Sequence, residues 1–133
     1  MLSVDTAKRW FRRVLWIGIG ANVALAVPTM AAPAMMLDFA CLPTATPDLW
    51  VRFAGLLLVL LSVFYMPAGF DPDRFRPVAW LSVASRLTGA VFFLFEPTYR
   101  MFGLFDFVFF VPEALLLTLL SRAEAARPEL AAL

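Results

Sequence analysis

Residues 49–66 read LWVRFAGLLLVLLSVFYM and hold a single charged residue, Arg52. The hydrocarbon core of a bilayer is about 30 Å thick, and a helix rising about 1.5 Å per residue needs roughly 20 apolar residues to cross it. An apolar run of this length with one charge near its start is typical of a membrane-spanning helix. The sequence therefore predicts that residues 49–66 cross a membrane.

Three further stretches have the same character, over residues 14–30, 78–95 and 101–120. Hydrophobic residues make up 62% of the 133-residue chain, whereas they make up roughly half of a soluble globular protein. We see no composition shift that would separate a second domain. The sequence predicts a single all-α domain over residues 1–133, an integral membrane bundle of four helices.

The basic residues indicate how this bundle is oriented. If the chain crosses four times, Arg52 and Arg100 flank one side of the membrane, eight basic residues flank the other, and Arg86 lies within a span. Lysine and arginine are enriched in the short loops on the cytoplasmic side, so both termini are expected in the cytoplasm. The aromatic residues expected at the cytoplasmic interface are Trp10, Trp16, Tyr65 and Trp80. The basic residues assigned to that side are Lys8, Arg9, Arg12, Arg13, Arg74, Arg76, Arg122 and Arg127.

The longest connection, residues 31–48, joins the first two predicted spans and faces outward in this topology. It contains Met35, Met36, Leu37 and Phe39 among prolines and is too apolar for a solvated linker. We expect a short helix lying on the outer membrane surface, or a segment that covers the mouth of the bundle. A segment that binds a partner is the alternative.

Four charged residues, Arg52, Arg86, Asp106 and Glu113, fall inside or at the edge of the apolar stretches. A charge in the hydrocarbon costs from about 2.5 kcal/mol upward, so such residues face the bundle interior and have partners. Arg86 and Glu113 are matched in depth on neighbouring antiparallel helices, and Arg52 and Asp106 both lie near the outer ends. The sequence therefore predicts two ion pairs, Arg86 with Glu113 and Arg52 with Asp106.

Small and hydroxylated residues accompany these charges at helix-face spacings and predict a polar seam between helices. Three interpretations follow. The whole set can be structural, it can line a pathway for a ligand, proton or ion, or it can contact a partner subunit. The residues of this seam are Asn22, Ser62, Ser82 and Ser85, with glycines such as Gly18 and Gly89 beside them.

Phenylalanines cluster around the outer half of the last two predicted spans. Exposure to lipid explains such a cluster, and a flat aromatic surface also suits a quinone tail, a pigment or the helix of another protein. The sequence does not separate these alternatives. The candidate face for lipid, quinone or a partner consists of Phe92, Phe93, Phe102, Phe105 and Phe109.

Several chemistries are excluded by composition. The chain contains no histidine and one cysteine, Cys41, so it offers neither bis-histidine haem ligation nor a cysteine cluster for metal. The sequence shows no pattern that would place a nucleophile next to a general base, and we assign no catalytic residue. A net charge of +1 without a basic run gives no reason to expect nucleic acid as a partner.

The order of WVRFAG at 50–55, FYMPA at 64–68, DPDRFR at 71–76 and then Arg86 resembles bacterial four-helix proteins of a DoxX-like kind. That resemblance covers most of the chain and implies a multi-pass protein of the bacterial inner membrane. It also implies a small subunit, since some DoxX-like proteins accompany quinone-linked oxidoreductases.

Our leading interpretation is a non-catalytic accessory or anchoring subunit of a larger inner-membrane complex, respiratory or photosynthetic. We expect such a subunit to have lipid and other membrane-protein subunits as partners, and no cofactor held by its own ligands. The alternative is a small autonomous transporter or channel that uses the buried arginine, aspartate and glutamate residues. A membrane enzyme ranks third.

Overall fold

The structure is a computed structural model that describes the backbone of residues 3–131 and the side chains of residues 3–126. The described residues form helices and loops without a strand, and four of the helices are long and apolar enough to cross a membrane. The side chain of Arg127, assigned above to one membrane side, lies outside the described residues. The helices are α1 (Val4–Ala31), α2 (Pro33–Phe39), α3 (Leu49–Phe70), α4 (Arg76–Leu94) and α5 (Arg100–Ala131), with a 3₁₀ turn η1 (Pro97–Tyr99).

The long helices extend beyond the apolar stretches that predicted them. α1 begins at Val4 because Ser3 caps it, its hydroxyl accepting the backbone N–H of Thr6. α3 continues past Pro67, where the sequence suggested a boundary, and ends at Phe70. A proline in the last turn of a helix removes one hydrogen bond there. At the end of α3 the carbonyl oxygen of Gly69 accepts hydrogen bonds from Arg12 Nε and Trp16 Nε1 of α1.

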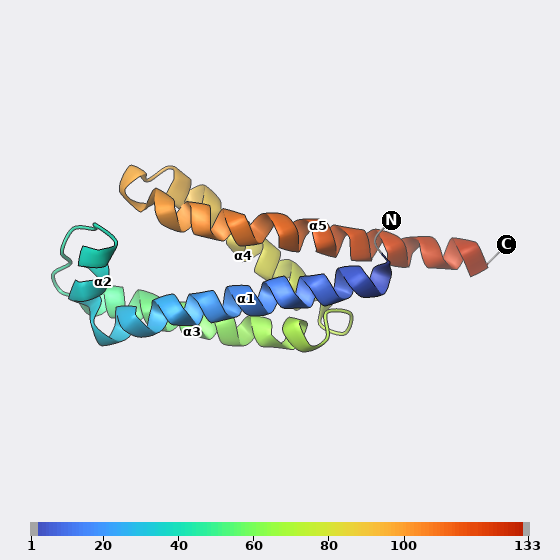
Figure 1. Cartoon of the computed structure of the whole chain (residues 1–133), viewed down its shortest axis with the longest axis horizontal. Coiled ribbons are helices and arrows are strands. Elements are labelled where there is room, and N and C mark those ends of the chain that lie inside the picture. Colours follow the sequence, from blue (N-terminus) through green and yellow to red (C-terminus); the bar gives the residue numbers. More distant parts are fainter. Residues whose placement is uncertain (1–2, 132–133) are drawn as a thin grey trace.

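Two antiparallel helical hairpins build the bundle, one from α1 and α3 and the other from α4 and α5 (Figure 1). Each hairpin is held closely where a glycine meets the partner's backbone. Gly55 of α3 packs against Ala26 and Met30 of α1, and Gly103 of α5 packs against Ala90 and Leu94 of α4. The hairpins meet where α1 crosses α5, and they diverge toward the end that carries α2 and η1 (Figure 1).

The apolar core lies at the end of the bundle where α1 begins and the α3–α4 loop turns, which we call the terminal end. All four long helices contribute to it, so the bundle is closed there. Tyr65 belongs to this core and is 2% exposed. Tyr65 was predicted near the cytoplasmic interface, and its side chain points into the bundle because the face of α3 that carries it turns inward. The buried core residues are Ala7, Phe11, Leu15, Ile19, Tyr65, Ala68, Ala79, Val83, Leu117 and Leu120.

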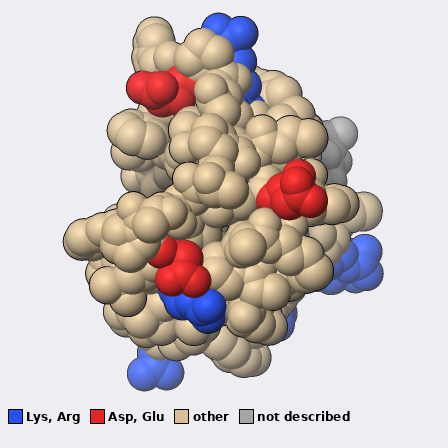
Figure 2. All heavy atoms as spheres, turned by 90° about the vertical axis from the view of Figure 1, so that its left-hand side faces the viewer, with Lys and Arg blue, Asp and Glu red and all other residues tan. Residues whose placement is uncertain are grey.

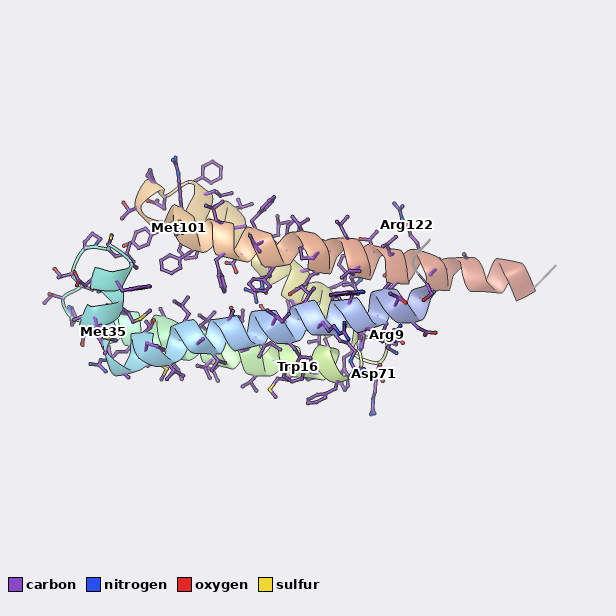
Figure 3. The ribbon with its side chains drawn as sticks, in the orientation of Figure 1. Arg9, Trp16, Met35, Asp71, Met101 and Arg122 are labelled. Atoms are coloured by element: carbon purple, nitrogen blue, oxygen red, sulfur yellow. The ribbon has the colours of Figure 1, made fainter. Side chains whose placement is uncertain are left out.

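The opposite end carries α2 and the η1 turn. Figure 3 shows Met35 and Met101 there, whereas Arg9, Asp71 and Arg122 lie toward the terminal end. Within residues 31–48, where we expected a short surface helix or a segment that covers the mouth of the bundle, the chain forms the short helix α2. Its aromatic side chain Phe39 is 84% exposed. Seen from this end, most of the surface is neither acidic nor basic and the charges are scattered (Figure 2).

Candidate functional site

Arg86 of α4 is the centre of a buried polar cluster and is 3% exposed. Its Nη1 donates to Oδ1 of Asp106 across 2.9 Å and to Oδ1 of Asn22 across 3.2 Å. The rings of Phe109 and Phe105 lie over its guanidinium, with centroids 4.9 Å and 5.8 Å from Cζ. Arg86 therefore joins α1, α4 and α5.

Two glycines make the room that these charged side chains occupy. A Cβ on Gly18 would lie 2.8 Å from Nη2 of Arg86, so the guanidinium rests directly on the backbone of α1. A Cβ on Gly89 would collide with the carboxylate of Asp106. Sequence reasoning assigned Gly18 and Gly89 to close helix contact, and the structure shows that they admit charged side chains instead.

Glu113 of α5 is fully buried, at 0% exposure. Its Oε2 lies 3.2 Å from the hydroxyl of Ser82, and that same hydroxyl lies 2.8 Å from the carbonyl oxygen of Ala79. Its Oε1 has no hydrogen-bond partner and lies 3.6 Å from the position that a Cβ of Gly18 would take. Arg86 Nη2 and Glu113 Oε1 thus face the same point of α1 without forming an ion pair.

Several buried polar atoms of the cluster lack a partner. They are Nε and Nη2 of Arg86, Oε1 of Glu113 and the hydroxyl of Tyr65. Each buried unpaired group costs about 1–3 kcal/mol. Nε and Nη2 form one edge of the guanidinium, the edge on which a carboxylate can bind through two parallel hydrogen bonds. Arg86 therefore binds Asp106 through Nη1, while the edge formed by Nε and Nη2 has no hydrogen-bond partner.

Sequence reasoning missed Tyr65 as a member of this cluster. Its hydroxyl faces Ser85 and lies within electrostatic reach of Arg86, Glu113 and Asp106, but makes no hydrogen bond of normal geometry. The available signal was spacing, because Tyr65 follows Ser62 by one helical turn and so shares its face.

Both predicted ion pairs are wrong in the described structure. Arg86 pairs with Asp106, because Asp106 packs against Gly89, one turn along α4 from Arg86. Arg52 pairs with Asp48, the residue that precedes α3, across 3.1 Å and donates to the carbonyl oxygen of Met30. Arg86 and Glu113 both face Gly18, yet the guanidinium binds Asp106 instead of Glu113.

The predicted polar seam divides into two groups. Asn22 and Ser82 contact charged groups on other helices. The hydroxyls of Ser62 and Ser85 donate to the carbonyls of Leu58 and Leu81, four residues earlier in their own helices. Only Asn22 and Ser82 therefore contact the charged residues of the cluster.

The predicted phenylalanine face is also divided. Phe105 and Phe109 pack against each other, with centroids 5.2 Å apart, and cover Arg86. Phe93 and Phe102 pack at 5.6 Å beside Tyr99 of η1, and Phe92 is exposed on the outside of α4. Phe105 and Phe109 therefore belong to the cluster, while Phe93 and Phe102 pack at the hairpin turn and Phe92 faces outward.

Ion pairs tie the terminal end together. Lys8 of α1 pairs with Asp73 in the α3–α4 loop, and Arg76 of α4 pairs with Asp73 and with Glu124 of α5. Backbone N–H groups, first that of Arg74, hold the pKa of Asp71 below its usual value. These ion pairs thus link the α3–α4 loop with α1, α4 and α5 at the terminal end, where the apolar core also lies.

The side chain of Asp106 is 20% exposed, so the cluster reaches the surface there, and Asp106 lies closer to the start of α5 than Glu113 does. Among the described side chains, no group of three or more histidine, cysteine, aspartate or glutamate residues could hold a metal ion. No protein-family model, curated protein or solved structure matches the chain.

Proposed function

We propose that this chain is a small membrane transporter that binds a proton or a small polar solute at the cluster of Arg86, Asp106 and Glu113. One observation carries the proposal: polar atoms of Arg86, Glu113 and Tyr65 are buried together in mid-bundle without partners. Intramembrane ionisable residues are costly and mark ion, proton or substrate pathways. A cluster that served stability alone would pair these atoms.

The arrangement of the hairpins supports the same proposal. The core and the ion pairs close the terminal end, and the partly exposed Asp106 opens toward the other end. A site in mid-membrane that is reached from one side at a time is what alternating access requires. The basic residues favour a cytoplasmic terminal end, and the DoxX-like resemblance favours the bacterial inner membrane. In that topology α2 lies on the outer surface and the site opens outward.

The test is flux through purified chain in liposomes, measured for protons, sodium and acetate. We expect Glu113→Gln and Arg86→Gln to abolish the flux while the protein still elutes as a single species. Asp48→Asn is the matched control, because Asp48 is an exposed carboxylate with an arginine partner at the edge of the bundle. Liposomes with wild-type chain that are no more permeable than empty ones would contradict the proposal.

A second candidate is an accessory or anchoring subunit of a larger inner-membrane complex, plausible in a respiratory or photosynthetic setting. The observation that favours it is the apolar surface at the opposite end, where Phe39 is 84% and Phe95 79% exposed. Exposed aromatic side chains there suit another membrane subunit, a lipid, a quinone or a pigment. Gentle solubilisation of native membrane and capture of a tagged chain tests it. A stoichiometric companion carrying haem, flavin or pigment supports this candidate, and a lone colourless oligomer contradicts it.

A further inference from the structure

The hydroxyl of Ser82 has one proton and two acceptors in reach. It lies 2.8 Å from the carbonyl oxygen of Ala79 and 3.2 Å from Oε2 of Glu113. A serine hydroxyl donates one hydrogen bond and accepts others. When its proton goes to the nearer carbonyl, the contact with Glu113 is a hydrogen bond only if the carboxyl group supplies the proton.

The surroundings of Glu113 agree with a neutral carboxylic acid. It is fully buried, and the described ion pair of Arg86 is with Asp106. A buried carboxylate without a paired cation would be an uncompensated charge. The groups that face the cluster and can titrate are Tyr65 from α3, Arg86 from α4 and Asp106 from α5. From α1 the cluster meets Gly18 and Asn22, which do not titrate.

We propose that Asp106 and Glu113 hold one proton between them, that Arg86 pairs with whichever carboxylate lacks it, and that the proton is the species this site handles. The proposal rests on the transport function inferred above and names its substrate. The free edge of Arg86, Nε and Nη2, is the part that would receive Glu113. Nη2 and Oε1 of Glu113 already lie 2.8 Å and 3.6 Å from one point above Gly18.

The exchange conserves charge and atoms. In the observed arrangement Glu113 is a carboxylic acid, Asp106 a carboxylate and Arg86 a cation bound to it. The O–H bond of Glu113 breaks, its proton passes through a water molecule and forms an O–H bond on Asp106, and the guanidinium turns its free edge to the new carboxylate. The cluster stays neutral throughout. Asp106 is partly exposed and can then give this proton to water, which leaves the cluster with one negative charge until a proton binds again to one of the two carboxylates.

Infrared spectroscopy of the full chain in liposomes tests the shared proton independently of flux. At neutral pH, wild type is expected to show a carboxylic acid band that Glu113→Gln removes and the control Asp48→Asn retains. Asp106→Asn should also remove the band, because Arg86 then turns to Glu113 and holds it ionised. A role confined to structure would leave Glu113 protonated in that variant.

Absence of the band in wild type, or its persistence in Asp106→Asn, overturns the proposal. Should Asp106→Asn not fold, Arg86→Met provides the second variant, since both carboxylates then lose their cation and the band should double. An Arg86→Met band equal to that of wild type would also overturn the proposal. Proton flux tests the transport function separately. If the wild-type chain shows the carboxylic acid band but carries no proton flux, the transport function is contradicted. If it carries proton flux but lacks the band, the shared proton is contradicted.

Discussion

The guanidinium of Arg86 binds the carboxylate of Asp106 across 2.9 Å, between two helices of one hairpin. The pair exists because Gly89 leaves the backbone of α4 bare where the carboxylate lies. Asp106 in turn leaves one guanidinium edge free toward Glu113. The geometry of this pair underlies the first two predictions.

Gly89→Ala should destabilise the bundle by about 1–3 kcal/mol, the usual cost of overpacking a buried site. The added methyl group would displace Asp106 from Arg86. Gly20→Ala is the matched control on α1, where a Cβ meets nothing within 4 Å, and helix propensity predicts no loss or a gain of about 0.5–1 kcal/mol. Thermal unfolding of the purified chain in detergent measures both. Equal melting temperatures for the two variants would refute the assigned role of Gly89.

A double-mutant cycle should show that Arg86 is coupled to Asp106. Arg86→Met alone is expected to cost about 3–5 kcal/mol, because it leaves the carboxylate of Asp106 without its cation. Asp106→Asn alone should cost less, because Arg86 can then turn to Glu113. The double variant should cost clearly less than the sum of the two.

The control is a double-mutant cycle on the exposed pair of Arg52 and Asp48, whose coupling energy should be no more than about 1 kcal/mol. Denaturant titrations in detergent give the free energies. Additive costs for Arg86 and Asp106 would show that the pair contributes nothing beyond its separate side chains.

Asp71 should make stability fall in acid. Its pKa is lowered in the folded chain, chiefly because its Oδ1 accepts the backbone N–H of Arg74 and also that of Asp73. The unfolded chain therefore takes up the proton first as pH falls below the ordinary value of 3.8. Its contribution is present above that value and is lost as pH falls through the lowered pKa. Melting temperatures across this range should decline less steeply for Asp71→Asn, whose amide oxygen keeps the turn, and parallel curves would count against the prediction.

Cys41 reports the orientation of the bundle, because it is the chain's single cysteine, is exposed, and lies in the connection after α2. If the termini are cytoplasmic, a membrane-impermeant maleimide should label Cys41 in intact spheroplasts. The matched control combines Cys41→Ser with Arg74→Cys, which moves the thiol to the α3–α4 loop and should require lysis for labelling. The reverse pattern would invert the proposed topology.

The sequence by itself determined the helical membrane architecture. Hydrocarbon offers no partner for backbone N–H and C=O groups, so an apolar run of sufficient length has to be a helix, and each run can be recognised without its neighbours. The same reasoning identified Arg86, Asp106 and Glu113, because a charge inside such a run is rare and costly. The short helix between the first two spans could also be predicted, from an apolar composition that no solvated linker has.

Only the tertiary structure decided which of these charges meet. Pairing depends on how each helix is rotated and tilted and on where a glycine leaves space, and the pattern of one helix carries none of this information. Arg86 therefore reaches Asp106 instead of Glu113, and Tyr65 turns into the core although its sequence position suited an interface. The free edge of Arg86 and the unpaired oxygen of Glu113 follow from the same packing, since both depend on Gly18 of a third helix.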